Sequence, residues 1–366
     1  MEKMLEQVLQ PFTLFLLAVL AVYTVLLIIL LRRLSPAEKV AKPFIIPPPR
    51  SLEDEQTEQT IQRFKDKADE AMRLNQTFRK FVPKQFVDHF AKHGSSSLEL
   101  GRADEDELAI LFCDIRGFTG LSELMSPQEL MNFLNSYFLR MNDPIHQNGG
   151  FIDKFIGDAI MALFDRPNGE NRDKAQDAIR AALDLRYAIS IYNQHRSNSK
   201  YPPINIGIGI HFGPVIIGTV GSDDRMDTTV IGDSVNIAYR LEALAPFYQS
   251  DIVVSAKALE VAEAEQHFNY RILDWVRVKG RKSPIEIYEI IDHMPTSVQR
   301  QKLANADLIA KGITSRTLQQ WPQALDYFHQ ALVINPDDNL VVHHIKQCEL
   351  LQKSVLPPNW DGALIL

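Results

Sequence analysis

Cysteine is almost absent from this chain. The 366 residues include only Cys113 and Cys348, and their spacing fits neither a zinc site nor a disulfide framework. A chain without a disulfide framework fits a reducing compartment. An excess of positive charge is also missing, since 39 Lys and Arg stand against 46 Asp and Glu and the formal net charge is −7. The composition therefore gives no argument for nucleic acid as a partner.

Long apolar runs are missing as well, with one exception at residues 11–31. This run contains no charged side chain, and it matches the roughly 20 residues that span a bilayer. Arg32 and Arg33 follow directly, and positive residues flank membrane helices on the cytoplasmic side. We expect a single-pass anchor in the inner membrane, with residues 1–10 as a short N-terminal segment and the rest in the cytoplasm. A signal peptide is the alternative, but the apolar core is too long for one.

Two segments follow the expected anchor. Residues 32–50 form a Pro-rich linker, which favours an extended chain. Residues 51–80 are highly charged, with apolar side chains at steps of three and four residues that predict an amphipathic helix. The helix either pairs as a parallel coiled coil or packs on its own domain. Its apolar stripe consists of Ile61, Phe64, Ala68, Ala71, Leu74 and Phe78.

Strand and helix patterns alternate further along the chain. Residues 108–113 form a continuous apolar run, which is typical of a buried strand. Ser126, Pro127 and Glu129 mark the start of a helix, with serine as N-cap and glutamate completing a capping box. Asn148 and two glycines end it. A second helix is expected at 173–194.

Hairpins are expected on either side of that second helix. Residues 151–156 and 159–164 flank a Gly-Asp pair, which predicts a tight hairpin with Asp158 near its tip. Later, alternating isoleucines at 204–210 predict a strand, and Gly213-Pro214 is expected to turn the chain into a partner strand. The order β-α-β-β-α-β indicates an α+β, ferredoxin-like fold of the palm type.

Asp114 and Asp158 occupy similar positions, in residues 111–115 (LFCDI) and 155–159 (FIGDA). Each borders short apolar runs of strand type, so both carboxylates are expected at one edge of a sheet. Paired carboxylates can hold two divalent cations about 3.5–4 Å apart for phosphoryl transfer. The alternative for each aspartate alone is a solvated turn or strand-end residue.

A second polar cluster lies at residues 228–242. Asp233 can cap a helix, which places Asn236 and Arg240 four residues apart on one face. An amide and a guanidinium on a rigid face can hold a sugar oxygen and a phosphate that gains charge. For Arg240 alone, an exposed surface arginine is the alternative. Lys154 is either a solvated cation or a donor to a base or phosphate.

The pattern changes after about residue 298 to that of a helical tail, residues 298–366. Trp321 opens the second of two expected helices. The spacing of Gly312, Ala324, Phe328, Ala331 and Pro336 is that of a single tetratricopeptide-like (TPR-like) unit. One unit cannot bury its own apolar face, so it needs the preceding domain, a second copy or a partner. A fragment of a lost array is the alternative.

Three ordered blocks resemble the signature blocks of the class III nucleotidyl cyclases. They are residues 112–119 (FCDIRGFT), 154–159 (KFIGDA) and 229–236 (TVIGDSVN). The resemblance implies a catalytic domain at residues 81–292 that converts ATP to cyclic AMP and pyrophosphate. The tail is similar to the one that follows several bacterial cyclases of this class, down to residues 357–362 (PPNWDG).

The resemblance implies that Asp114 and Asp158, with the backbone carbonyl of Ile115, bind two Mg²⁺ or Mn²⁺ ions. Such ions lower the pKa of the ribose 3′-hydroxyl and neutralise the triphosphate. The 3′-oxygen then attacks the α-phosphorus in line, and no protein group need act as general base.

The resemblance also implies the roles of the residues that hold the nucleotide. Lys154 and Thr229 match the positions that read the purine, whereas Asn236 and Arg240 match those that orient the ribose and stabilise the transition state. A lysine and a hydroxyl suit adenine, and a guanine reader would carry an acceptor such as glutamate at position 154. ATP is therefore the expected substrate.

Three positions suggest finer assignments. Threonine at position 229, where many family members carry aspartate, marks the subgroup called class IIIb, which includes bicarbonate-stimulated cyclases. Bicarbonate is therefore a hypothetical ligand here. Lys279 and Arg281 lie between the last expected strands and either contact the β- and γ-phosphates or belong to a plain basic turn.

In this family the metal-binding aspartates come from one subunit and the purine and transition-state residues from the other. Because this chain carries every element, the resemblance implies a homodimer with two sites at the subunit interface. The helix at 51–80 would then control the dimer through a small rotation. The alternatives are a guanylate cyclase and a catalytically silent nucleotide-binding or dimerisation module. A diguanylate cyclase is excluded, because the signature turn of that family is absent from this sequence.

Overall fold

The structure, a computed structural model, describes residues 52–78 and 103–365 except 167, 223, 279, 280 and 282, and the single residues 22, 24, 25, 26, 83 and 86. Residues 1–73 and 74–366 form separate units. The predicted transmembrane segment 11–31 lies outside the described residues apart from its four single positions. In the part of the chain that is described, no helix combines the length and the apolar character needed to cross a membrane.

The first unit contains most of helix α2 (Leu52–Phe78), which confirms the helix predicted at 51–80. The side chains of its apolar stripe from Ile61 to Leu74 are exposed, with Ile61, Phe64 and Leu74 between 50 and 70% exposed. An exposed stripe at this spacing can pair with another helix. The coiled coil itself stays a prediction.

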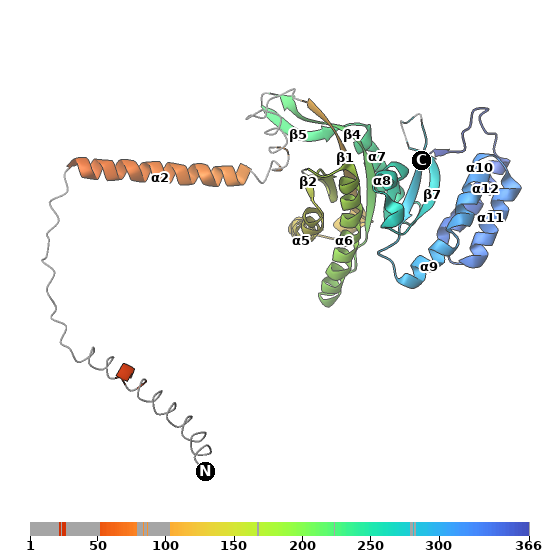
Figure 1. The fold of residues 1–366 in the computed structure, drawn as a ribbon, viewed down its shortest axis with the longest axis horizontal. Coiled ribbons are helices and arrows are strands. Elements are labelled where there is room, and N and C mark those ends of the chain that lie inside the picture. The colour runs from red at the N-terminus through yellow and green to blue at the C-terminus, as the bar shows by residue number, and fades with distance from the viewer. Residues whose placement is uncertain are drawn as a thin grey trace, which may run out of the picture. The chain divides into compact units, whose positions relative to one another are not determined.

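The second unit is built on one mixed sheet with helices packed against it (Figure 1). Its first half consists of β1 (Ala103–Ile115), α4 (Phe118–Ser122), α5 (Pro127–Gln147), β2 (Gly150–Ile156), β3 (Ala159–Phe164), α6 (Asn171–Asn198) and β4 (Ile206–Ser222). Strands β2-β3-β1-β4 lie in that order and pair antiparallel throughout, which is the order expected of a ferredoxin-like core.

The second half extends the sheet and adds the tail. It consists of β5 (Arg225–Ile231), α7 (Asp233–Leu244), β6 (Ile252–Ser255), α8 (Ala256–Val261), η1 (Ala264–Gln266), β7 (Tyr270–Arg277), β8 (Ile285–Ile290), α9 (Thr296–Ala304), α10 (Ala306–Thr317), α11 (Trp321–Ile334), α12 (Asn339–Lys353) and β9 (Leu364–Ile365). The sheet continues from β4 as β6-β8-β7-β9, while β5 pairs with β4.

Strand β1 is the centre of the core. Ala109, Leu111 and Cys113 face a cluster formed with α5 and α6, whereas Ile110 and Phe112 face a cluster on the opposite side of the sheet. Both faces of the strand are therefore buried, which explains its unbroken apolar run.

Helix α5 begins as predicted. Ser126 Oγ accepts a hydrogen bond from the Glu129 amide, and the Glu129 carboxylate accepts one from the Ser126 amide, so the capping box is complete. Pro127 occupies the first turn, and the helix ends at Gln147, one residue before Asn148. Its apolar side covers the sheet next to α6 (Figure 1).

The turn predicted at Gly213-Pro214 is wrong. Strand β4 runs without interruption through both residues and pairs with β1 from Ile206 to Gly218. Pro214 lies between the stretches of β4 that pair with β6 and with β5. A proline is tolerated there because neither β5 nor β6 pairs with this residue on the side of β4 away from β1, so neither strand requires the missing N–H. The chain turns only after Ser222.

Helix α7 lies unusually close to β4. A Cβ atom at Gly209 would stand 2.2 Å from the backbone nitrogen of Glu242, so only glycine permits this approach. The contact fixes the helix that carries Asn236 and Arg240 against the central strands.

The tail docks on β7 and β8 through two buried polar clusters. Arg271 of β7 pairs with Glu289 and with Asp338, which precedes α12, and its Nη1 donates to Asn305 at 3.1 Å. Burial alone would raise the pKa of Asp338, but the hydrogen bond and charge of Arg271 hold it below its ordinary value. These contacts make the tail part of the same compact unit.

The second cluster joins α10 to β7. The fully buried Arg316 pairs with Asp274, which also accepts a hydrogen bond from Tyr248 at 2.9 Å. Helices α10 and α11 lie so close that a Cβ atom at Gly312 would stand 2.4 Å from the Phe328 ring. The helical tail is therefore observed, with α11 beginning at Trp321, while its assignment to the TPR class stays a prediction.

The buried cluster around Arg271 gives a testable prediction. Removing the guanidinium in Arg271→Ala leaves the buried Asp338 carboxylate without its cation and leaves Glu289 with Lys302 alone, so the free energy of unfolding should fall by about 3–5 kcal/mol. Chemical denaturation measures this loss. Arg300→Ala, at an exposed position of α9, is the matched control and should change it by less than about 0.5 kcal/mol. Equal effects of the two variants would contradict the importance of the cluster.

Candidate functional site

The two aspartates singled out in the sequence lie together. Asp114 is the second-last residue of β1, and Asp158 lies in the turn between β2 and β3, where Gly157 adopts a φ of +65°. The amide of Ile115 donates to Asp114 Oδ1 at 3.0 Å and to Asp158 Oδ2 at 3.2 Å. The antiparallel pairing of β1 with β3 therefore brings both carboxylates to one amide, as the sequence predicted.

The proximity of the carboxylates has an electrostatic cost. Burial, the hydrogen bond with Asp114 and the charge of Asp114 raise the pKa of Asp158 to about 7. Like charges in close contact disfavour double ionisation, and a bound cation relieves that repulsion. Carboxylate oxygens are the donors that Mg²⁺ and Mn²⁺ prefer, so the pair fits such ions.

No group of three or more His, Cys, Asp or Glu side chains suited to a metal occurs among the described residues. A cation at Asp114 and Asp158 would therefore complete its coordination with backbone carbonyls such as that of Ile115, with water or with substrate oxygens. This is the usual way in which proteins bind Mg²⁺ next to phosphates.

A third carboxyl group, Glu242, lies behind Asp114. Burial, followed by the charge of Asp114, raises the pKa of Glu242 to about 7, and Arg116 opposes this shift. A Cβ atom at Gly207, the residue that pairs with Asp114 across the sheet, would stand 2.8 Å from Glu242 Oε1. Sequence reasoning missed Glu242, because in the sequence it is only another charged residue of the expected helix, two positions after Arg240.

Lys154 and Thr229 form a second cluster, as their predicted common role requires. Lys154 Nζ lies 3.5 Å from Asp153 Oδ2 and 3.6 Å from Asp227 Oδ2. Thr229 Oγ1 donates to the same Asp153 oxygen at 3.2 Å. Strands β2 and β5 thus bring the two residues to one buried carboxylate.

Asp153 is the central residue of that cluster, and sequence reasoning missed it. Its side chain is fully buried, and burial raises its pKa to about 6 although Lys154 and Thr229 act in the opposite direction. The signal available in the sequence is an acidic residue next to a lysine within a short apolar strand.

Asn236 and Arg240 lie on the face of α7 opposite its buried residues, as the spacing predicted. The Asn236 side chain donates to the carbonyl of Gly232 at 3.5 Å. Arg240 makes neither an ion pair nor a hydrogen bond with any described residue, so its guanidinium is available to an anion.

The two residues predicted to contact phosphates have different outcomes. Lys279 lies outside the described residues. Arg281 pairs with Asp233, at the start of α7, at 3.2 Å and lines a cavity of about 510 Å³ together with Gly213 and Ser234. Arg281 is therefore held beside the helix that carries Asn236 and Arg240.

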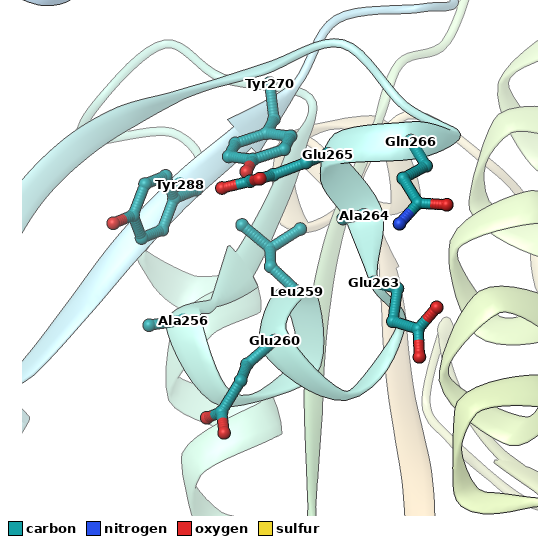
Figure 2. A pocket seen from close by; sticks show the side chains of 9 residues that line it. All are labelled: Ala256, Leu259, Glu260, Glu263, Ala264, Glu265, Gln266, Tyr270 and Tyr288. Carbon is teal, nitrogen blue, oxygen red and sulfur yellow. The ribbon is translucent and has the colours of Figure 1, made fainter.

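Another hollow of about 370 Å³ lies between α8, η1, β7 and β8 (Figure 2). Figure 2 shows Glu265 beside Tyr270, with Glu260 and Glu263 lower in the same pocket. None of the predicted site residues lines it, and its carboxylates would repel a nucleoside triphosphate. We therefore place the candidate site at the carboxylate pair and not in this pocket.

Comparison with known proteins gives matches to nucleotide cyclases. The family model described as the adenylate and guanylate cyclase catalytic domain matches residues 101–292, more than half of the chain. An adenylate cyclase of Anabaena cylindrica is 42% identical over 219 residues, which make up 58% of this chain and 42% of that protein. The terminal-differentiation-specific adenylate cyclase of Dictyostelium discoideum is 34% identical over 276 residues, 75% of this chain and 13% of that protein.

Among solved structures, a bacterial light-regulated adenylyl cyclase superposes with a TM-score of 0.56 at 28% identity, covering 67% of this chain and 70% of that one. The palm-type α+β fold is thereby confirmed. The chain spans less than half the length of either of these two curated relatives.

The carboxylate pair gives a prediction for metal binding. Because a carboxylate must lose its proton to bind a cation, Mn²⁺ affinity should rise with pH, by about tenfold per unit below 7, and level off above the pKa of Asp158. Electron paramagnetic resonance of free Mn²⁺ with the nucleotide-free protein measures this dependence.

Asp158→Asn should weaken Mn²⁺ binding at least about tenfold and abolish the pH dependence. Asp326→Asn, at an exposed position of α11, is the control and should leave both unchanged. Equal Mn²⁺ binding by the Asp158→Asn variant and the unchanged protein would show that the pair is not the cation site.

Proposed function

The chain belongs to the adenylate and guanylate cyclase catalytic domain family, and from this premise we propose that it is an adenylate cyclase that forms 3′,5′-cyclic AMP and pyrophosphate from ATP. The observation that carries the proposal is the convergence of Asp114 and Asp158 on one amide, with Lys154 and Thr229 gathered at Asp153. Similarity to the two curated adenylate cyclases supports the choice of substrate.

Each residue then has a chemical task. Asp114 and Asp158 hold two Mg²⁺ or Mn²⁺ ions, which when bound lower the pKa of the ribose 3′-hydroxyl and offset the charge of the triphosphate. Asn236 orients the ribose, and Arg240 donates to the α-phosphate as charge develops there. Lys279 and Arg281 contact the terminal phosphates. To do so, Arg281 gives up its ion pair with Asp233 and binds phosphate oxygens instead.

The base is read by Lys154 and Thr229. Lys154 donates to N1 of adenine, which is an acceptor, and the hydroxyl of Thr229 accepts from the 6-amino group. The exposed Asp227 beside Lys154 is an acceptor that guanine can use, so GTP turnover is the alternative that the assay below distinguishes.

We propose further that two copies of the chain complete each site. Among the described residues, no hydrogen bond or ion pair joins the carboxylate pair to Lys154, Thr229, Asn236 or Arg240, so a single chain leaves the two halves of the site unconnected. Large apolar side chains are exposed on β2, β5 and α7, which carry these residues, and on β4, which pairs with β5. A surface of this kind suits a second copy. The exposed side chains are Phe155, Ile156, Ile216, Val220, Met226, Ile231 and Tyr239.

The remaining proposals concern segments at the two ends of the chain and a regulator. Residues 11–31, uncharged and followed by Arg32 and Arg33, anchor the protein in the inner membrane with the catalytic domain in the cytoplasm. The helical tail at residues 298–366 contains a single TPR-like unit, and this tail is docked on β7 and β8. Thr229 suggests bicarbonate as an activator, and a flat response to bicarbonate at fixed pH would remove that proposal.

An activity assay tests the reaction. The full chain, supplied with ATP or GTP and with Mn²⁺ or Mg²⁺, should release cyclic AMP from ATP, and Asp114→Ala should lower the turnover at least about 100-fold because it removes half of the carboxylate pair. Cyclic GMP as the main product would instead assign a guanylate cyclase. Nucleotide binding with no product would indicate a silent binding module.

Mixing two inactive variants tests the shared site. Asp114→Ala and Arg240→Ala lie in different halves, so a mixed dimer has one intact site and one doubly altered site. Equal amounts of the two should recover about a quarter of the unaltered activity if subunits exchange freely. Neither variant should recover activity alone, and no recovery after verified exchange would contradict the two-copy site.

A further inference from the structure

The Asp153 carboxylate lies behind the residues that read the base. Its side chain is fully buried, Oδ2 accepts the hydroxyl proton of Thr229 at 3.2 Å, and Lys154 Nζ lies 3.5 Å away. Oδ1 is buried with no hydrogen-bond partner among the described residues. A buried ionised carboxylate has only acceptor positions, so Thr229 must be the donor in this contact.

This contact restricts what Thr229 can do for a ligand. A hydroxyl carries one hydrogen and two lone pairs. When the hydrogen is given to Asp153, the oxygen that remains towards the base can only accept. The group at C6 of adenine is an amine, which donates, whereas the group at C6 of guanine or hypoxanthine is a carbonyl, which accepts. The Thr229 oxygen therefore attracts a 6-amino purine and repels a 6-oxo purine.

We propose that Asp153 is a specificity-determining positioning residue, which selects 6-amino over 6-oxo purine nucleotides by fixing the Thr229 hydroxyl as an acceptor. This inference rests on the proposed cyclase function. Asp153 does not contact the base itself and acts through Thr229. The pKa of about 6 leaves its carboxyl mostly ionised at neutral pH, which keeps it an acceptor.

The neighbouring Asp227 provides a contrast. It lies 3.6 Å from Lys154 Nζ, so it contributes the same charge to the lysine, but its side chain is 61% exposed and forms no hydrogen bond with the Thr229 hydroxyl. An effect of charge on Lys154 should appear in variants of both aspartates. An effect on the direction of the Thr229 hydroxyl should appear only in variants of Asp153.

The test compares kcat/KM for ATP, GTP and ITP, the 6-oxo analogue without a 2-amino group, in the full chain. Asp153→Asn keeps an acceptor, because its amide oxygen can take the place of Oδ2 towards Thr229 and Lys154. Asp153→Leu removes the acceptor and frees the hydroxyl hydrogen to meet a 6-carbonyl. In Asp153→Leu the ATP:ITP and ATP:GTP ratios should fall about tenfold, the value of one hydrogen bond of ordinary strength. Asp227→Asn should keep both ratios within about twofold.

A double variant shows whether the effect passes through Thr229. In a Thr229→Val background, which lacks the hydroxyl, Asp153→Leu should no longer change the ratios, whereas in a Thr229→Ser background it should change them as before. Each ratio compares two substrates on the same variant. A smaller fraction of folded enzyme lowers kcat/KM for every substrate equally, so it leaves the ratios unchanged.

Unchanged ratios in Asp153→Leu overturn the proposal, as does an equal change in the Thr229→Val background. If the Asp153 variants fail to fold, Thr229→Val and Thr229→Ser alone decide, because the proposal requires that valine lowers discrimination and serine preserves it. An unaltered chain that cyclises no purine nucleotide would instead defeat the proposed function.

Discussion

Strand β1 is hydrogen-bonded to β4 along its whole length and to β3 near its end, and the position of every candidate catalytic group depends on that pairing. It holds Asp114 against the turn that carries Asp158, although this raises the pKa of Asp158 to about 7. A slip of one residue would move Asp114 to the other face of the sheet. Because both faces of β1 are buried, such a slip would force the side chains of each core cluster into the packing of the other. The core thus stabilises an arrangement that the carboxylates alone would oppose.

The features that could be predicted from the sequence are those with local causes. The buried strand at 108–113, the capping box at Ser126 and the hairpin with Asp158 near its tip all depend on residues within a few positions of one another. The turn expected at Pro214 also had a local cause, and there the prediction was wrong. A glycine followed by proline favours a turn, but the pairing of β4 with β1 continues through both residues and decides the conformation.

Groups whose role depends on distant partners could not be predicted. Arg271 and Asp338 are 67 positions apart, and each would be taken from the sequence alone as an exposed charge. Their burial follows from the docking of the tail on β7, which no local pattern indicates. Asp153 is similar, since its importance becomes visible only when β5 brings Thr229 to the carboxylate of β2.

Charge is unevenly divided between the two halves of the site, and this division connects substrate binding with subunit pairing. The half at Asp114 and Asp158, with Glu242 behind it, is rich in carboxyl groups and therefore repels a triphosphate unless cations accompany it. The half on α7 offers Arg240, a guanidinium without a partner among the described residues, and therefore attracts one. In the proposed dimer these halves face each other across one nucleotide, so the nucleotide and its cations neutralise both. Because coupling between two binding equilibria is reciprocal, a nucleotide that requires both copies must also hold them together.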